Sequence, residues 1–528
     1  MALVRRSSAT KGGNSSLESA GSGQVLPPGV GAQNRRSVAG MSMELFEQHQ
    51  GTHILQGIDI RLRRSFEYDR LPQLSFKIHC LQCTYRGFLR PKFPFKTYYY
   101  LCIVKANEMD DDMFYALALC DWSNLQLRRR NLARRHCGPK QHTDNFSRIG
   151  SVATFESIEL LQTLKHITRN TESSINIKPL LMMSAMNMFS NYMCSVRFDS
   201  ETDVEFKKIV DHFDEIFWEI NQGYAVDFLP WLAPFYKKHM EKLSNWSQDI
   251  RSFILSRIVD QREIHLDTEG PEKDFLDGLL RVLHDDPNVD RNTIIFMLED
   301  FLGGHSSVGN LVMLCLAAVA RDADVGKKIK AEIDGVTKGK RAVTLSDKIN
   351  LPYTEATILE CLRYASSPIV PHVATEPAVI AGYGIEKGTV VFINNYELNT
   401  SDKYWDEPEK FDPNRFLERN KIRVRRNSLC DSGMESDSER STPINKTSDT
   451  EKEVVNVRKN IPHFLPFSIG KRTCIGQTLV TTMSFVMFAN IIQEFDIRAE
   501  NIEDLKQRPA CVALPKETFN LYLLPRKH

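Results

Sequence analysis

The sequence predicts a mainly α-helical globular protein that also contains small β-sheets. From about residue 116 onward, apolar residues recur at three- and four-residue spacing, the pattern of amphipathic helices. Residues 376–396 instead carry glycines between β-branched and aromatic residues, which is typical of short hairpins. The 528 residues are 42% hydrophobic and include 29 Phe, enough for a large buried core, so the chain as a whole is not disordered.

The predicted helices follow one another toward the C-terminus. They cover residues 151–170, 205–223, 231–261, 275–284, 292–320, 351–365 and 475–495. The helix at 292–320 is long and apolar and carries Gly303 and Gly304 in its middle, which allows a kink there. Pro352 suits the first turn of its helix, because proline lacks an N–H that the first turn would leave unbonded.

Three segments lie outside this helical pattern. Residues 1–40 are rich in Gly and Ser, so we expect a disordered tail. Residues 41–115 form a divergent region without helical period, with an aromatic cluster at 93–100 and a candidate strand at 101–104. Residues 419–460 are charged and rich in Ser and Thr, and bury too little apolar surface to offset their ordering entropy, so we expect a disordered insertion. The remainder, 116–528, is expected to be one domain.

Composition excludes some classes of protein. The 68 Lys and Arg nearly balance the 67 Asp and Glu, which argues against a dedicated nucleic-acid binder. The longest apolar run, Leu311–Ala320, is too short for a membrane span, which needs roughly 18 residues. Eleven scattered Cys indicate a reduced intracellular protein. The first residues contain Arg and Ser but no acid before Glu18, which suits a flexible tail and weakly resembles a transit peptide.

The strongest signal surrounds Cys474. The run that begins at Phe467 reads Phe-Ser-Ile-Gly-Lys-Arg-Thr-Cys-Ile-Gly and leads into the last apolar helix. Gly470 and Gly476 allow the backbone to turn tightly and approach a flat ligand closely. A helix that starts beside Cys474 helps to hold its sulfur as a thiolate. Arg472 suits a carboxylate on the ligand, and Phe467 gives an apolar wall.

This run resembles the haem-binding loop of cytochrome P450 enzymes, F-x-x-G-x-R-x-C-x-G, with every fixed position matched. Other elements of that family precede it in the family's order. Glu360 and Arg363 lie on one helix face and resemble its E-x-x-R pair. Arg415 lies in a run that resembles its P-E-R-F element, with Asn414 in place of the acid. The resemblance implies that Glu360, Arg363 and Arg415 form a structural network that braces the haem-loop side of the fold.

The resemblance also implies the fold and the cofactor site. It implies the cytochrome P450 fold, with haem b between the long helix and the loop, and Cys474 as the axial ligand of the haem iron. Trp122 and Arg129 lie in a segment that resembles a family helix in which a Trp and an Arg reach haem propionates. His372 sits where family members place an Arg or His near a propionate, and a core histidine is the alternative. The implied cofactor-binding residues are Cys474, Arg472, Phe467, Gly470, Gly476, Trp122, Arg129 and His372.

The long helix departs from the family pattern [A/G]-G-x-[D/E]-T, where proton delivery takes place. It reads Gly303-Gly304-His305-Ser306-Ser307. Ser307 keeps a hydroxyl in the Thr position, whereas Ser306 replaces the acid. Proton delivery normally needs such a relay, so two alternatives stay open: His305 substitutes for the acid, or the substrate supplies a hydroxyl. Gly304, His305, Ser306 and Ser307 are therefore the candidate catalytic residues.

Two runs, Phe301–Asn310 and Ala116–Trp122, resemble more narrowly the insect Halloween enzymes of the spook and spookier group. This resemblance implies a haem-thiolate monooxygenase that oxidises a sterol, an early ecdysteroid precursor, using dioxygen. Electrons would come from NADPH through NADPH-cytochrome reductase, and the basic run around Arg134 is either a docking surface for that donor or a solvated face.

The resemblance implies association with the cytosolic face of the endoplasmic reticulum membrane, although residues 1–115 do not match the anchored family members. A mitochondrial location is the alternative. Two other functions compete with sterol oxidation: a xenobiotic monooxygenase of broad range, and a non-catalytic haem- or sterol-binding protein.

Overall fold

The computed structural model describes residues 2–4, 81–82 and 124–526, apart from 170–172, 223, 229, 287–288, 290, 367–370, 375, 381, 426–448, 459 and 506–510. The described part is mainly helical with small β-sheets, which confirms the predicted fold class. Trp122, the aromatic cluster at 93–100 and the candidate strand at 101–104 lie outside the described residues.

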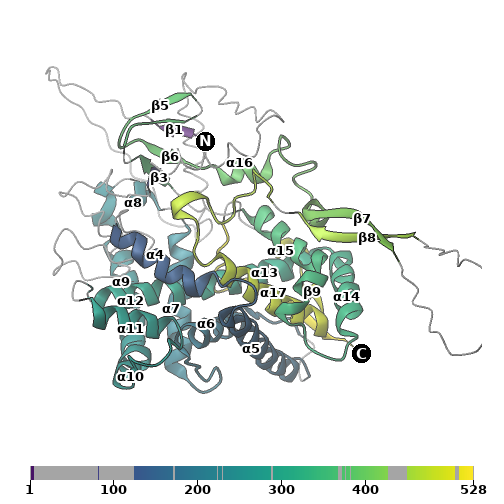
Figure 1. Ribbon diagram of the computed structural model, residues 1–528, viewed down its shortest axis with the longest axis horizontal. Coiled ribbons are helices and arrows are strands. Elements are labelled where there is room, and N and C mark those ends of the chain that lie inside the picture. The colour runs from purple at the N-terminus through teal and green to yellow at the C-terminus, as the bar shows by residue number, and fades with distance from the viewer. Residues whose placement is uncertain are drawn as a thin grey trace, which may run out of the picture.

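Four helices pack against one another in the helical body, with α5 at its lower rim in Figure 1: α5 (Asp144–Arg169), α6 (Lys178–Cys194), α13 (His305–Arg321) and α17 (Gln477–Glu494). α17 packs on α5 and α13, and α13 packs on α6. The other helices are α4 (Asn124–Cys137), α7 (Val204–Ile220), α8 (Ala225–Phe228), α9 (Lys237–Ile254), α10 (Asp260–Ile264), α11 (Phe275–Asp285), α12 (Arg291–Leu302), α14 (Ala323–Thr337), α15 (Pro352–Ala365) and α16 (Asn395–Thr400). One contiguous apolar core joins most of them.

Each predicted helix has a counterpart, with shifted ends or a subdivision. The segment predicted as one helix at 231–261 is divided into a 3₁₀ turn (Pro230–Tyr236), α9, a π turn (Leu255–Val259) and the start of α10. α6 is absent from the predicted helices because it is buried on nearly every side, so its apolar residues do not follow one face. α14 was also not predicted, although Val325, Ile329 and Ile333 recur every four residues and are buried.

The long apolar helix is interrupted at Gly303 and Gly304. The amides of Gly304, Ser306 and Ser307 donate to the carbonyl three residues earlier, at 3.0, 3.2 and 3.1 Å, so the backbone tightens into a 3₁₀-like turn. A Cβ atom on Gly304 would lie 2.9 Å from the carbonyl oxygen of Phe301 and 3.0 Å from the ring of Phe189. Glycine is therefore what allows α6 to pack this closely against the kink.

Among the described helices, the stretch Arg291–Arg321, formed by α12 and α13, is long and apolar enough to cross a membrane. Its apolar window is 83% buried inside the protein. The stretch is therefore a core element, since its apolar side chains already contact other helices.

A four-stranded antiparallel sheet lies beside the helical body, with strand order β1 (Ala2–Val4), β6 (Val390–Phe392), β3 (Pro371–Ala374) and β2 (Leu81–Gln82). Ala2–Val4 belongs to the predicted disordered tail, so that prediction is wrong for these three residues. They are the apolar part of the tail, and they pair with the edge of β6. The predicted hairpin region also contains β4 (Ala378–Ile380) paired with β5 (Tyr383–Ile385), and β9 (Phe495–Ala499) pairs with β10 (Leu521–Pro525).

The segment 419–460 also differs from the prediction of disorder. Its two ends form an antiparallel ribbon of β7 (Leu417–Arg425) and β8 (Asp449–Val457), which extends from the body in Figure 1. The register places basic residues of β7 opposite acidic residues of β8. Lys421 of β7 lies opposite Glu453 of β8, and Arg419 Nη1 lies 3.5 Å from the Glu453 carboxylate. Opposite charges across a strand pair are stabilising, a gain that composition alone does not reveal. Residues 426–448 lie outside the described chain.

Two glycine substitutions test the packing at the kink. We expect Gly304→Ala to lower the free energy of unfolding by about 1–3 kcal/mol, because the Phe189 ring must move to admit the methyl group. Gly335→Ala in α14 is the control, since nothing lies within 4 Å of its added Cβ, and it is expected to raise stability by up to about 1 kcal/mol. Denaturant unfolding of both variants measures this, and equal effects would contradict the close approach of α6.

Candidate active site

Cys474 lies at the end of a tight loop that leads into α17. The loop turns at Ser468 and Gly470, whose φ angles of 61° and 74° are left-handed. Glycine adopts this conformation without strain, which explains its use at position 470. A 3₁₀ turn (Gly470–Arg472) follows, and the Cys474 amide donates to the Phe467 carbonyl at 2.9 Å, which closes the loop.

Opposing effects act on the ionisation of Cys474. Cys474 is exposed toward the cavity, yet the protein packed around its sulfur displaces much of the surrounding water, and this larger effect raises the pKa of the thiol above its usual value. Hydrogen bonds from the amides of Gly476 and Gln477 and the charge of Arg130 act in the opposite direction. Arg130 reaches the loop from α4, where it donates to the Thr473 carbonyl at 2.6 Å. The pKa of the thiol is therefore raised overall, while the two amides and Arg130 act in favour of the thiolate.

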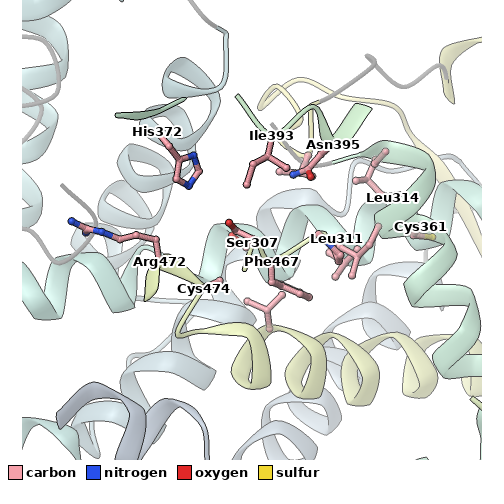
Figure 2. A pocket seen from close by; sticks show the side chains of 16 residues that line it. Ser307, Leu311, Leu314, Cys361, His372, Ile393, Asn395, Phe467, Arg472 and Cys474 are labelled. Atoms are coloured by element: carbon pink, nitrogen blue, oxygen red, sulfur yellow. The ribbon is translucent and has the colours of Figure 1, made fainter. Parts of the chain in front are cut away.

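A cavity of ≈ 320 Å³ lies against this sulfur. Its lining residues come from α13, α15, β3, the start of α16 and the residues before it, the Cys474 loop, α17 and the C-terminal segment. They are Ser307, Leu311, Leu314, Cys361, Leu362, Ala365, His372, Ile393, Asn395, Pro466, Phe467, Ser468, Arg472, Cys474, Val480 and Val512. Figure 2 shows His372 and Arg472 toward one end of the cavity and Leu311 and Leu314 toward the other.

These residues fit an iron porphyrin. Cys474 offers a sulfur ligand. Bonding to a metal ion deprotonates a thiol outright, so a bound iron would overcome the raised pKa of this thiol. The basic side chains of His372 and Arg472 line one end of the cavity, where they suit the two propionates of haem. Phe467 of the Cys474 loop and Val480 of α17 are apolar lining residues that suit the macrocycle.

The four candidate residues for proton delivery lie in different surroundings. Ser307 lines the cavity, whereas His305 does not. The His305 ring is fully buried, with Nδ1 at 2.6 Å from the Leu302 carbonyl and its plane edge-on to Phe213. Burial lowers the pKa of His305 to about 4, so the ring is neutral at physiological pH. Ser306 is also fully buried, and its hydroxyl oxygen has no hydrogen-bond partner in the described part of the chain.

The structure places Arg129 away from the cavity lining. Its guanidinium is buried and donates to the Thr293 hydroxyl of α12 at 3.0 Å. The next residue, Arg130, is the one that contacts the Cys474 loop, and the sequence prediction missed it. In the run Arg128–Arg130, small differences in helical phase decide which guanidinium faces the loop. Those differences cannot be resolved by counting from Trp122.

Glu360, Arg363 and Arg415 lie together, as the resemblance implied. Glu360 and Arg363 are fully buried and share two hydrogen bonds of 2.7 and 2.8 Å, and Arg415 Nε lies 3.5 Å from Glu360. Burial raises the pKa of Glu360, and the charge and hydrogen bond of Arg363 oppose that rise. The network supplies hydrogen bonds to the segment between α16 and β7. Arg363 donates to the carbonyls of Asn399, Pro408 and Lys410, and Arg415 to those of Asp406, Glu407 and Lys410.

Comparison with known proteins decides the family. The family model described as cytochrome P450 matches residues 128–523. The chain belongs to the cytochrome P450 family. Cytochrome P450 307a1 of Drosophila melanogaster is 51% identical over 420 residues, which cover 78% of this chain and 73% of the relative. Cytochrome P450 2U1 of Homo sapiens is 32% identical over 325 residues, which cover 58% of this chain and 53% of the relative.

The fold agrees with this assignment. A solved zebrafish cytochrome P450, described as a structure with progesterone, superposes with a TM-score of 0.61 at 21% identity, covering 78% of this chain and 85% of that one. The protein is therefore a P450 monooxygenase of the P450 fold. Enzymes of this family use haem b, with electrons from NADPH through a reductase, and oxidise small hydrophobic substrates.

The Glu360 carboxylate gives a first prediction. Glu360→Gln removes the charge that compensates the fully buried Arg363, so we expect unfolding free energy to fall by about 3–5 kcal/mol, with loss of haem incorporation. The matched control is Glu355→Gln in the same helix, whose partner Lys348 lies 3.1 Å away at the partly exposed surface. That variant is expected to lose at most about 1 kcal/mol. Similar losses in the two variants would contradict the importance of the buried pair.

A second prediction concerns acid stability. Because the folded-state pKa of His305 is about 4, below the ordinary 6.5, the unfolded chain binds more protons between these values. The contribution of His305 to stability is therefore complete above pH 6.5 and declines as the pH falls toward 4, by roughly 3 kcal/mol in total. We expect His305→Asn to flatten this part of the stability profile, measured by denaturant unfolding at each pH. The same substitution at exposed His284 is the control, and an unchanged slope in His305→Asn would refute the assignment.

Proposed function

We propose that this P450 oxidises a sterol and acts on an early ecdysteroid precursor. The observation that carries the proposal is the 51% identity to cytochrome P450 307a1 of Drosophila melanogaster, together with the run Phe301–Asn310 that resembles the Halloween group. The site agrees with such a substrate. Leu311, Leu314 and Val512 offer apolar surface to a flat hydrocarbon body.

The haem, when bound, supplies the redox chemistry that transfers one oxygen atom from dioxygen to the substrate. The chain supplies the shape of the cavity, the sulfur of Cys474 and the handling of protons. No carboxylate lines the cavity among the described residues, and Ser307 provides a hydroxyl there. We propose that Ser307 holds a water molecule or a substrate hydroxyl that passes on the proton, which suits a sterol because a sterol carries a hydroxyl group.

We further propose that electrons arrive from NADPH-cytochrome reductase at the face formed by α4. Arg134 and Arg135 are exposed at the end of that helix, and an acidic partner would be attracted to them. The proposed location is the cytosolic face of the endoplasmic reticulum, where the reductase would be available. A mitochondrial location would require a different electron donor, so fractionation together with reductase pairing distinguishes the two.

The test is turnover by purified holoenzyme with reductase, NADPH and a panel of sterols, analysed by mass spectrometry. We expect one or a few sterols to give an oxygenated product, with a substrate-induced spin-state shift for the same compounds. Turnover of many unrelated apolar compounds would support a xenobiotic monooxygenase instead. Spin-state shifts without any product would support a sterol-binding protein.

Ser307→Ala tests the proton-handling role. We expect product formation to fall roughly tenfold or more, while NADPH is still consumed and more peroxide is released, because electron delivery no longer leads to oxygen insertion. Ser484→Ala is the control, since this serine of α17 is fully buried and does not line the cavity. Unchanged product yield per NADPH in Ser307→Ala would sink the role of this hydroxyl.

A further inference from the structure

A buried charged network packs against the part of α13 that is C-terminal to the kink. It consists of Lys178 at the start of α6, Asp214 of α7 and Asn310 of α13. The exposed fraction of the surface is 1% for Lys178, 5% for Asp214 and 1% for Asn310, although Lys178 and Asp214 are ionisable. None of the three lines the cavity, so the haem site does not account for them.

The Lys178 ammonium uses all three of its hydrogens. It donates to Asp214 Oδ2 at 2.5 Å and to the carbonyls of Leu514 and Pro515 at 2.7 and 3.2 Å. One charged group thereby joins α6, α7 and the C-terminal segment.

Asn310 connects this cluster to the kink. Its Nδ2 group donates to the Ser306 carbonyl at 2.8 Å and to Asp214 Oδ1 at 3.4 Å, and its Oδ1 accepts from the Leu514 amide at 2.9 Å. Leu514 is thus held twice, through its amide by Asn310 and through its carbonyl by Lys178. Position 306, which lacks the family's acid, has its backbone carbonyl in the same network.

The held segment reaches the cavity. Val512 lies two residues before Leu514 and lines the cavity together with Ser307, which follows Ser306 in α13. The network therefore connects two parts of the cavity wall that are about two hundred residues apart in sequence. A shift of Leu514 would move Val512 relative to Ser307.

Stability alone is a weak reason for such a network. Burial lowers the pKa of Lys178 and raises the pKa of Asp214, which shows that both charges lose hydration. A buried ion pair of this kind contributes little more stability than apolar side chains of the same size, while it fixes geometry through directional bonds. The network is therefore suited to fixing the C-terminal segment at Leu514 relative to α13.

We propose that Lys178, Asp214 and Asn310 are positioning residues that fix Val512 relative to Ser307 and so set how a long ligand lies in the cavity. The proposal rests on the P450 site and does not depend on the sterol assignment. On this proposal, the affinity of a short ligand that makes little contact with Val512 is independent of the network. A long apolar ligand contacts the held segment, and its affinity depends on the network.

The experiment compares two probes in ferric holoenzyme: imidazole and 1-dodecylimidazole, each titrated by the spectral shift of nitrogen ligation. Asp214→Asn removes the ion pair with little change of shape. We expect the affinity for 1-dodecylimidazole to fall roughly tenfold, because the displaced Val512 packs less well against the alkyl chain, and that for imidazole to change less than about twofold. Glu156→Gln is the matched control, because Glu156 is also a buried carboxylate paired with an arginine, at 2.7 Å, and does not line the cavity.

A second variant, Asn310→Ala, has a readout that needs neither haem ligation nor turnover. We expect hydrogen exchange at the Leu514 amide to accelerate at least roughly tenfold, because the amide loses its acceptor, while exchange in Glu156→Gln stays at the parent rate. Equal weakening of both imidazoles, or unchanged affinity for both, in Asp214→Asn would overturn the proposal. Unchanged exchange at Leu514 in Asn310→Ala would also overturn it. Loss of sterol turnover alone would bear on the proposed substrate and not on this network.

Discussion

The structure depends on one sulfur atom that is held where burial opposes its charge. Cys474 sits against a largely apolar cavity, and burial raises the pKa of its thiol. Two amides at the start of α17 and the charge of Arg130 partly offset that effect. A metal ion bonded to the sulfur would stabilise the thiolate further. Cofactor binding and chemistry are thereby linked at a single atom, because the loop positions the sulfur that binds the metal ion.

The Glu360 network holds a different part of the chain, the segment between α16 and β7. Glu360 and Arg363 lie in α15 with no exposed surface, yet most of their bonds go to backbone carbonyls and to Arg415 in the irregular segment 399–415. An irregular segment near the core has many unsatisfied carbonyls, and a buried guanidinium satisfies several of them at once. The energetic cost of burying the charges is therefore offset by ordering a segment that has no regular hydrogen bonding of its own.

The sequence was sufficient for the parts of the molecule in which residue type and spacing determine the geometry. The helices at 275–284 and 351–365 follow from their periodicity, and the Cys474 loop follows from its glycines and its cysteine. The sequence was not sufficient where contacts with residues distant in sequence determine the local structure. The uniformly buried α6 lacks a single apolar face, the β7–β8 ribbon depends on pairing between strands that are distant in sequence, and the choice between Arg129 and Arg130 depends on the packing of α4.

Ser306 stands where the family motif has an acid, so another residue has to take part in proton delivery. The fully buried His305 faces Phe213 and is neutral at physiological pH, and Ser306 is buried, so Ser307 is the member of the motif that lines the cavity. Sequence reasoning named all of these residues but could not rank them, because burial on a helix that is apolar all round is decided by the packing of α6 and α7.

The most direct test of the account is the carbon monoxide spectrum of the reduced holoenzyme in Cys474→Ser and Cys137→Ser. Cys137 is a buried thiol whose pKa is raised by burial and, to a lesser extent, by the charge of Cys474, so it is the matched control. The account predicts the thiolate-ligated spectrum in the parent protein and in Cys137→Ser, and its loss in Cys474→Ser. A thiolate spectrum that persists in Cys474→Ser would contradict the central role of this sulfur.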